Sequence, residues 1–161
     1  MIEGGTVTVT TVVPCEAERA FRAFTDEIDA WWRRGARFRA RPDRPSRMKF
    51  EQGTPGRFVE VYDDGSGDVF EHGKILDWTP FDRVVFEMRG RDFAPDERTE
   101  VEVSFEELDA GTRVTVRHHG WDSLPPDHPA RHGLTGEAFL TMMRVWWGDL
   151  LVAAGAHLRK V

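Results

Sequence analysis

Alternation of apolar and polar residues through the middle of the chain constrains the fold more than any other feature. The runs RVVFEM (83–88), TEVEVSFEEL (99–108) and TRVTVRHH (112–119) each place apolar side chains at every second position over most of their length. Successive side chains of a strand point to opposite faces of a sheet. These runs therefore predict an antiparallel sheet with one apolar face and one wet face.

Further runs extend this sheet. Residues 6–13 alternate β-branched and polar positions, and RMKFEQ, GRFVEVYDD and FEHGKILDW are typical of strands. Turn residues separate the runs: Asp64 and Gly65 predict a hairpin turn, and TPFD and DAG join the later strands. The sequence thus predicts six or seven antiparallel strands.

Two segments have helical spacing. Residues 15–32 follow Pro14 and carry acids in the first turn, with a break expected near Thr25, so one or two short helices follow the first strand. Residues 134–159 predict one long amphipathic helix. Its expected apolar stripe comprises Phe139, Met142, Met143, Trp146, Leu150, Ala153 or Ala154, and Leu158.

The order of these segments predicts an α+β helix-grip fold in a single domain spanning residues 1–161. Only the C-terminal helix is long enough to cover the apolar face of the sheet, so the curved sheet must wrap around it. A chain of 161 residues suffices for one such core.

Composition excludes several classes of protein. The net charge of −6 argues against a general nucleic-acid surface, and no apolar run is long enough to span a membrane, so a cytoplasmic protein is expected. The single cysteine, Cys15, excludes an internal disulfide. Residues 33–47 carry seven arginines and predict a solvated loop; a polyanion site, or a loop that draws an anionic ligand to a cavity mouth, are the alternatives.

Adjacent histidines at the end of the last expected strand have different environments. His118 shares the inward face of Val114 and Val116, whereas His119 points outward, so the two are not expected to bind one metal. His118 is expected either to bond within the core or to contact a ligand. His128 and His132 have i, i+4 spacing but lie among prolines, which favours a surface loop over a metal site.

The strand FEHGKILDW is ambiguous. Counting apolar residues puts Phe70, His72, Lys74, Leu76 and Trp78 on the inward face. His72 then joins His118 as a polar group in an aromatic cavity, while a solvent-facing Lys74 is at least equally compatible with the pattern.

Aromatic residues and methionines exceed what a tight two-layer core uses, which favours a cavity. We therefore predict a binding site without a metal, a cofactor or a catalytic set. Its expected ligand-contacting residues are Trp31, Trp32, Phe58, His72, Phe86, Met88, Phe105, His118, Trp121, Phe139, Met142, Met143 and Trp146.

Several motifs, in order, resemble the START-related (SRPBCC) superfamily, and within it the branch called activator of heat-shock protein ninety ATPase homologue, C-terminal-like. These are DAWW, E-x-x-x-x-G-R at 51–57, DDGSGD, HGKILDWTPFDRVVFEM and GTRVTVRHHGW. The resemblance runs from about Thr6 to Leu158, although Pro55 stands where the family often has a glycine. It implies a helix-grip fold around a hydrophobic cavity. Eukaryotic namesakes are co-chaperones linked to the stress response, bacterial members are mostly unassigned, and no catalytic set is shared.

Three functions remain open at this point. The leading hypothesis is a binding protein that encloses a small hydrophobic or aromatic molecule between sheet and helix. The alternatives are a cyclase or hydrolase that uses His118 as an acid or base, and a chaperone-associated interaction module, which requires an exposed apolar patch. A homodimer is also compatible with the sequence, through the outer edge of the sheet.

Overall fold

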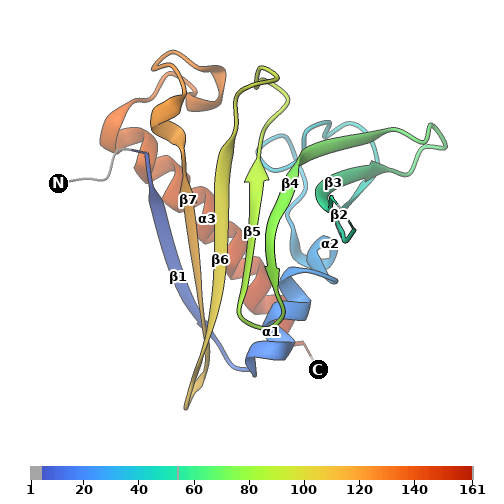
Figure 1. Cartoon of the computed structure of the whole chain (residues 1–161), viewed down its shortest axis with the longest axis vertical. Helices are drawn as coiled ribbons and strands as arrows, with labels where there is room; N and C mark the ends of the chain where they lie inside the picture. Colours follow the sequence, from blue (N-terminus) through green and yellow to red (C-terminus); the bar gives the residue numbers. More distant parts are fainter. Residues whose placement is uncertain (1–4, 54, 161) are drawn as a thin grey trace.

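The computed structural model describes residues 5–53 and 55–160 and has the predicted α+β helix-grip architecture (Figure 1). The elements in chain order are β1 (Val7–Val13), α1 (Ala17–Phe24), α2 (Ile28–Trp31), β2 (Ser46–Glu51), β3 (Arg57–Tyr62), β4 (Val69–Thr79), β5 (Arg83–Met88), β6 (Thr99–Leu108), β7 (Gly111–His119) and α3 (Gly136–Leu158). Two single-turn 3-10 helices, η1 (Trp121–Ser123) and η2 (Pro129–Arg131), precede α3.

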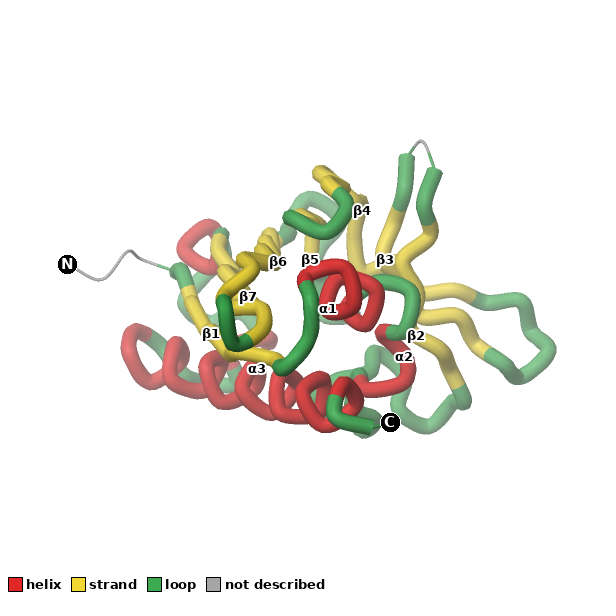
Figure 2. The backbone as a smooth tube through the Cα atoms, turned by 90° about the horizontal axis from the view of Figure 1, so that it is seen from below, coloured by secondary structure: helices red, strands yellow, loops and turns green. Residues whose placement is uncertain are grey.

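All seven strands form one antiparallel sheet in the order β1-β7-β6-β5-β4-β3-β2. The sheet curls over α3, and Figure 2 shows α3 along one side of the molecule with α1 and α2 near one end. Among the described residues, no helix has the length and apolar character needed to cross a membrane.

Strand alternation was predicted correctly for the central strands. Val103 lies opposite Val116, and Phe105 opposite Val114, and all four side chains are buried. The polar positions between them face outward. Burial of one row per strand is what fixes the register, because a slip by one residue turns every valine toward water.

Strand β4 departs from simple alternation because it pairs in two halves. Residues 69–74 pair with β3 and residues 75–79 pair with β5, with a register shift in each ladder. His72 is buried as predicted, and Lys74 takes the solvent-facing alternative. Leu76 is exposed, so the inward position expected for it is wrong. Gly73 is required at the bulge, because a Cβ atom there would overlap the carbonyl group of Glu87.

The break between α1 and α2 falls at Thr25, as predicted. Its hydroxyl donates a hydrogen bond to the Phe21 carbonyl oxygen (2.8 Å), and its own backbone N–H bonds the same carbonyl. This local bonding ends α1 and lets Trp31 turn into the core, where its indole N–H donates to the Ala23 carbonyl oxygen (2.7 Å).

Helix α3 presents a slightly different face to the sheet from the one predicted. Its buried residues are Phe139, Leu140, Met143, Trp147, Leu150, Leu151, Ala154 and Gly155. Met142 and Trp146 are only partly buried and lie at the flank of this face. Trp147, rather than Trp146, occupies the centre, so the predicted stripe was rotated relative to the observed one.

The arginine-rich segment is not a uniformly solvated loop. Arg39 is buried and donates to the Trp32 carbonyl oxygen (2.8 Å) and to Asp29 (3.1 Å). Arg37 pairs with Asp149 on α3 (3.5 Å). The remaining ion pairs of the segment join Arg34 to Asp29, Arg44 to Asp64 and Asp68, and Arg47 to Asp63. Most of the arginines in this segment therefore already pair with a carboxylate of the same chain, which argues against a polyanion site. The ion pairs instead connect the segment to α2, to α3 and to the residues that follow β3.

Candidate functional site

The predicted aromatic residues do meet in the interior. Trp32 is at the centre, with its ring centroid 5.6 Å from that of Phe58, 5.8 Å from that of Trp146 and 6.0 Å from that of Trp147. Phe58 in turn lies 5.1 Å from Phe86. The rings therefore pack edge to face between the sheet and α3, a geometry that stabilises a closed core.

Only a small space remains among these rings. The interior cavity measures about 10 Å³, which is room for about one water molecule. Its lining consists of Phe24, Thr25, Ile28, Trp31, Trp32, Phe50, Val84, Phe86, Val103, Phe105 and Trp147. Four predicted residues, Trp31, Trp32, Phe86 and Phe105, therefore border the space. Sequence reasoning missed the other seven lining residues, although Phe24 and Trp147 among them do lie at inward helical positions.

The other predicted residues lie around this centre rather than on it. Phe58, Phe139 and Met143 are buried in the core, while Met88, Met142 and Trp146 pack against it at the edges. His118 and Trp121 form a separate contact toward the start of α3, with ring centroids 4.7 Å apart. The side chains fill the volume that a ligand was expected to occupy.

His118 sits on β7 between Val7 of β1 and Val101 of β6, and only 2% of it is exposed. The indole N–H of Trp147 donates to Nδ1 of His118 (3.0 Å). Because Nδ1 accepts, the neutral ring carries its proton on Nε2, which donates to the hydroxyl of Thr99 (2.7 Å). The hydroxyl of Thr99 in turn donates a hydrogen bond to the Met88 carbonyl oxygen (2.7 Å).

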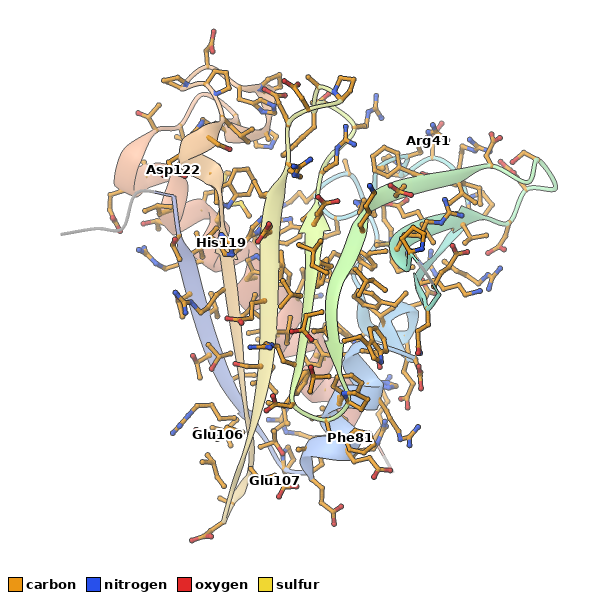
Figure 3. The ribbon with its side chains drawn as sticks, viewed as in Figure 1. Arg41, Phe81, Glu106, Glu107, His119 and Asp122 are labelled. Atoms are coloured by element: carbon orange, nitrogen blue, oxygen red, sulfur yellow. The ribbon has the colours of Figure 1, made fainter. Side chains whose placement is uncertain are left out.

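This chain of hydrogen bonds leaves neither ring nitrogen of His118 free. Burial lowers the pKa of His118 to about 3, with a smaller effect from His119, so the ring is neutral at physiological pH. The geometry therefore favours the core role of His118 over an acid or base role. His119 points outward, as predicted, and lies 3.6 Å from Glu100 at the surface (Figure 3).

A second buried polar cluster lies under the β2–β3 hairpin. Glu60 is fully buried and accepts hydrogen bonds from the backbone N–H of Ala40 (2.6 Å) and the hydroxyl of Tyr62 (3.1 Å). His72 Nε2 lies 3.0 Å from the same carboxylate, and its Nδ1 donates to the Arg89 carbonyl oxygen (3.1 Å). Burial alone would raise the pKa of Glu60, but these hydrogen bonds outweigh it and hold that pKa below its ordinary value. The cluster therefore joins β3, β4 and the segment before β2 through one buried carboxylate.

His128 joins the loops at the end of the sheet near η1 and η2. Its side chain is buried, so the predicted surface position is wrong. Its Nε2 donates to Glu97 (2.9 Å), and its Nδ1 accepts from the backbone N–H of Ala130 (3.1 Å). The ring also packs edge-on against Phe93 at 4.8 Å. Within residues 5–53 and 55–160, no group of three or more metal-ligating side chains comes together.

A more spacious cleft than the interior cavity lies on the outside. A cleft of about 230 Å³ lies between the β2–β3 connection and the second half of β4. Its described lining residues are Gln52, Gly53, Gly56, Ile75, Leu76, Asp77 and Trp78. The backbone N–H of Ile75 donates to the Gly56 carbonyl oxygen (2.9 Å), and no strand pairs with residues 76–79 on this side within the described part of the chain.

Exposed apolar side chains accompany this cleft. Leu76 is 48% exposed, and Phe81, at the β4–β5 turn, is 39% exposed (Figure 3). Phe81 is anchored by an edge-to-face contact with Phe21 at 5.8 Å. Leu76 thus places an exposed apolar side chain in the cleft itself, and Phe81 adds a second one at the following turn.

The fold and its closed interior define a helix-grip domain of the START-related type. Residues 14–144 match the sequence profile of the Activator of Hsp90 ATPase homolog 1-like proteins, and the chain belongs to this family. The predicted family resemblance is thereby confirmed. Among curated proteins, none is significantly similar in sequence to this chain.

Solved structures show the same fold at low sequence identity. An HSP90 activator from Plasmodium falciparum is 18% identical, with a TM-score of 0.65 and 96% of each chain covered. A protein from Mesorhizobium loti is 17% identical, with a TM-score of 0.66, 97% of this chain and 99% of that chain covered. The Aha1 dimer from Colwellia psychrerythraea is 16% identical, with a TM-score of 0.59 and 95% of each chain covered.

Proposed function

We propose that this chain is a protein-interaction module whose partner is an ATPase of the Hsp90 chaperone class. The observation that carries the proposal is the open cleft beside the unpaired edge of β4, in a molecule whose interior is filled by side chains. Membership of the family and the shared fold with an HSP90 activator support the choice of partner.

The chemistry of the cleft suits an extended segment of a partner protein. Residues 77–79 pair with β5 on one side, and on the other side no strand of the described chain pairs with residues 76–79. An unpaired strand edge recruits an added strand through main-chain hydrogen bonds, while pockets for alternate side chains provide specificity. Leu76 and Ile75 supply the apolar contacts in the cleft.

Charges at the cleft are largely satisfied within the molecule. Asp77 accepts from Arg83 (2.6 Å) and from the Thr79 hydroxyl (2.7 Å). Arg57 pairs with Glu51 (2.6 Å) and lies 3.5 Å from Glu71. The partner segment is therefore expected to contribute apolar side chains and main-chain bonds rather than a strong charge.

The test compares two variants of similar exposure at opposite sides of the sheet. Leu76→Asp alters the cleft, and Val12→Asp alters an equally exposed residue on β1 (44%). Binding to an Hsp90-class ATPase is measured by calorimetry, and the ATPase rate is followed in parallel. Loss of a buried leucine contact is worth about 1.5–3 kcal/mol, so affinity should fall roughly ten- to hundredfold for Leu76→Asp only. Equal binding by both variants, or absence of binding by the unmodified chain, would overturn the proposal.

A small hydrophobic or aromatic ligand in the interior is the second candidate function. It is supported by the mainly aromatic lining of the residual cavity, in which Thr25 is the one residue of the described chain that is neither aromatic nor aliphatic. Because that cavity holds about one water, a ligand has to displace rings such as Trp32 or Phe86. Native mass spectrometry of the purified chain tests this candidate: a bound molecule released by Trp32→Ala supports it, and a chain of unliganded mass counts against it.

A further inference from the structure

The side of α3 that faces away from the sheet is apolar. Val145 and Val152 are 54% and 67% exposed, the two highest values among the exposed large hydrophobic residues of the described chain. They lie seven residues apart, so two helical turns separate them on one face. The exposed stripe is continued by Ala138, Thr141 and Ala156, with Gly148 between the two valines.

A helix that is apolar on both sides is normally buried on both sides. The inner face of α3 packs on the sheet through residues such as Phe139, Trp147 and Leu150. Figure 2 shows that no helix or strand of the described chain covers the opposite side. The outer stripe is therefore without a partner within the described chain.

Two charges near the ends of this face, Glu137 and Arg159, lie at equal distances from Gly148. Glu137 lies eleven residues before it and Arg159 eleven residues after it, which is about 16 Å in each direction along a helix axis. Arg159 lies over Gly155 and has no carboxylate partner among the described residues. Glu137 contacts Arg144 (2.9 Å), and its side chain remains 55% exposed.

We infer that the partner of this face is a second copy of the same chain, with the two α3 helices packed antiparallel and crossing at Gly148. In this arrangement Val145 of each copy contacts Val152 of the other. Glu137 of each copy lies opposite the free guanidinium of Arg159 in the other, so both ends of the contact gain an ion pair. Gly148 has open space where a Cβ would be, which lets the two backbones approach closely.

The flanks of the stripe do not oppose this pairing. Asp149 is neutralised by Arg37 (3.5 Å), and its carbonyl oxygen accepts from Arg33 (3.0 Å). A strip one helix wide and about 34 Å long is smaller than the roughly 800 Å² per partner of a standard tight interface. The dimer is therefore expected to dissociate in the micromolar range.

Self-association is measured by sedimentation velocity over a concentration series from about 1 μM to about 1 mM. Val152→Glu should shift dissociation at least tenfold to higher concentration without changing the unfolding curve of the monomer. Val12→Glu, a charge placed on the exposed face of β1, is the matched control and should dimerise normally. A chain that stays monomeric throughout, or a dimer that Val152→Glu leaves intact, would overturn the inference.

Charge reversal tests the antiparallel register itself. Glu137→Arg alone and Arg159→Glu alone should each weaken their own homodimer, because like charges then face each other twice. An equimolar mixture of the two variants should form a heterodimer tighter than either homodimer, since both facing pairs become Arg with Glu. A mixture that associates no better than its components would exclude this register, whatever the outcome of the chaperone-binding test.

Discussion

The hydrogen-bonded chain through His118 makes a prediction about acid stability. In the folded state the pKa of His118 is lowered to about 3 from an ordinary value of 6.5, because the ring is buried. Between these values the unfolded chain binds a proton that the folded chain does not. The stability that the neutral ring of His118 contributes is therefore fully present above pH 6.5. This contribution is lost as the pH falls from 6.5 toward 3.

The magnitude follows from the linkage of one proton. Each pH unit within this window is worth about 1.4 kcal/mol, so lowering the pH from 6.5 to 4.5 should cost roughly 2–3 kcal/mol through this residue alone. His118→Gln keeps a neutral polar group on the same inward position but cannot titrate. Its free energy of unfolding should start lower at pH 7.5, because the bonds to Trp147 and Thr99 are altered, and should fall less steeply with acid.

Urea unfolding at a series of pH values measures the effect as a difference in slope. The comparison removes the contributions of carboxylates and of the other histidines, which both proteins share. His119→Gln is the control, because it removes the neighbouring exposed histidine and leaves the buried hydrogen bonds of His118 in place, so its profile should stay closer to that of the unmodified chain than the His118→Gln profile does. Parallel stability profiles for the unmodified chain and His118→Gln between pH 6.5 and 4.5 would refute the assignment of a buried neutral ring.

Three further changes have defined outcomes, each measurable by urea unfolding. Thr99→Val removes the acceptor of the buried histidine N–H and should cost about 1–3 kcal/mol. Glu60→Gln replaces the buried carboxylate that Ala40, Tyr62 and His72 contact and should cost about 1–3 kcal/mol at neutral pH. Because the pKa of Glu60 is lowered, that contribution is present above its ordinary value of 4.5 and is lost as pH falls through the folded pKa, so the variant should show a shallower decline in acid. Gly73→Ala forces a methyl group into the neighbouring strand and should cost about 1–3 kcal/mol, whereas Gly90→Ala, which has only ordinary contacts, should be close to neutral.

The sequence alone predicted the strands in which apolar and polar residues alternate without interruption, and the break between the first two helices. Strict alternation in β5, β6 and β7 placed Val103, Phe105 and Val116 inward and separated His118 from His119. Such patterns are reliable because a register slip exposes an entire row of valines. The break at Thr25 was also predictable, since its hydroxyl competes for a backbone carbonyl.

The candidate site depended on features that alternation does not encode. Two register shifts in β4 rotate Lys74 and Leu76 outward, and they arise from pairing with two different strands. On α3, two adjacent tryptophans fit the same stripe, and only the packed structure distinguishes Trp147 at the centre from Trp146 at the flank. An excess of large side chains indicates a large core, but whether rings fill the core or leave a cavity depends on their mutual geometry.

The bond between Trp147 and His118 also limits how the interior can open. Moving α3 away from the sheet at this point would leave the indole N–H and Nδ1 of the histidine unpaired in a buried site, at a cost of about 1–3 kcal/mol for each. A purely hydrophobic ligand cannot replace those bonds. Because Trp147 also lines the residual cavity, a ligand that enters there has to displace Trp32 or Phe86 while Trp147 keeps its place. A ligand that binds without perturbing His118 is thus compatible with this interior, whereas one that displaces Trp147 must bring a polar group of its own.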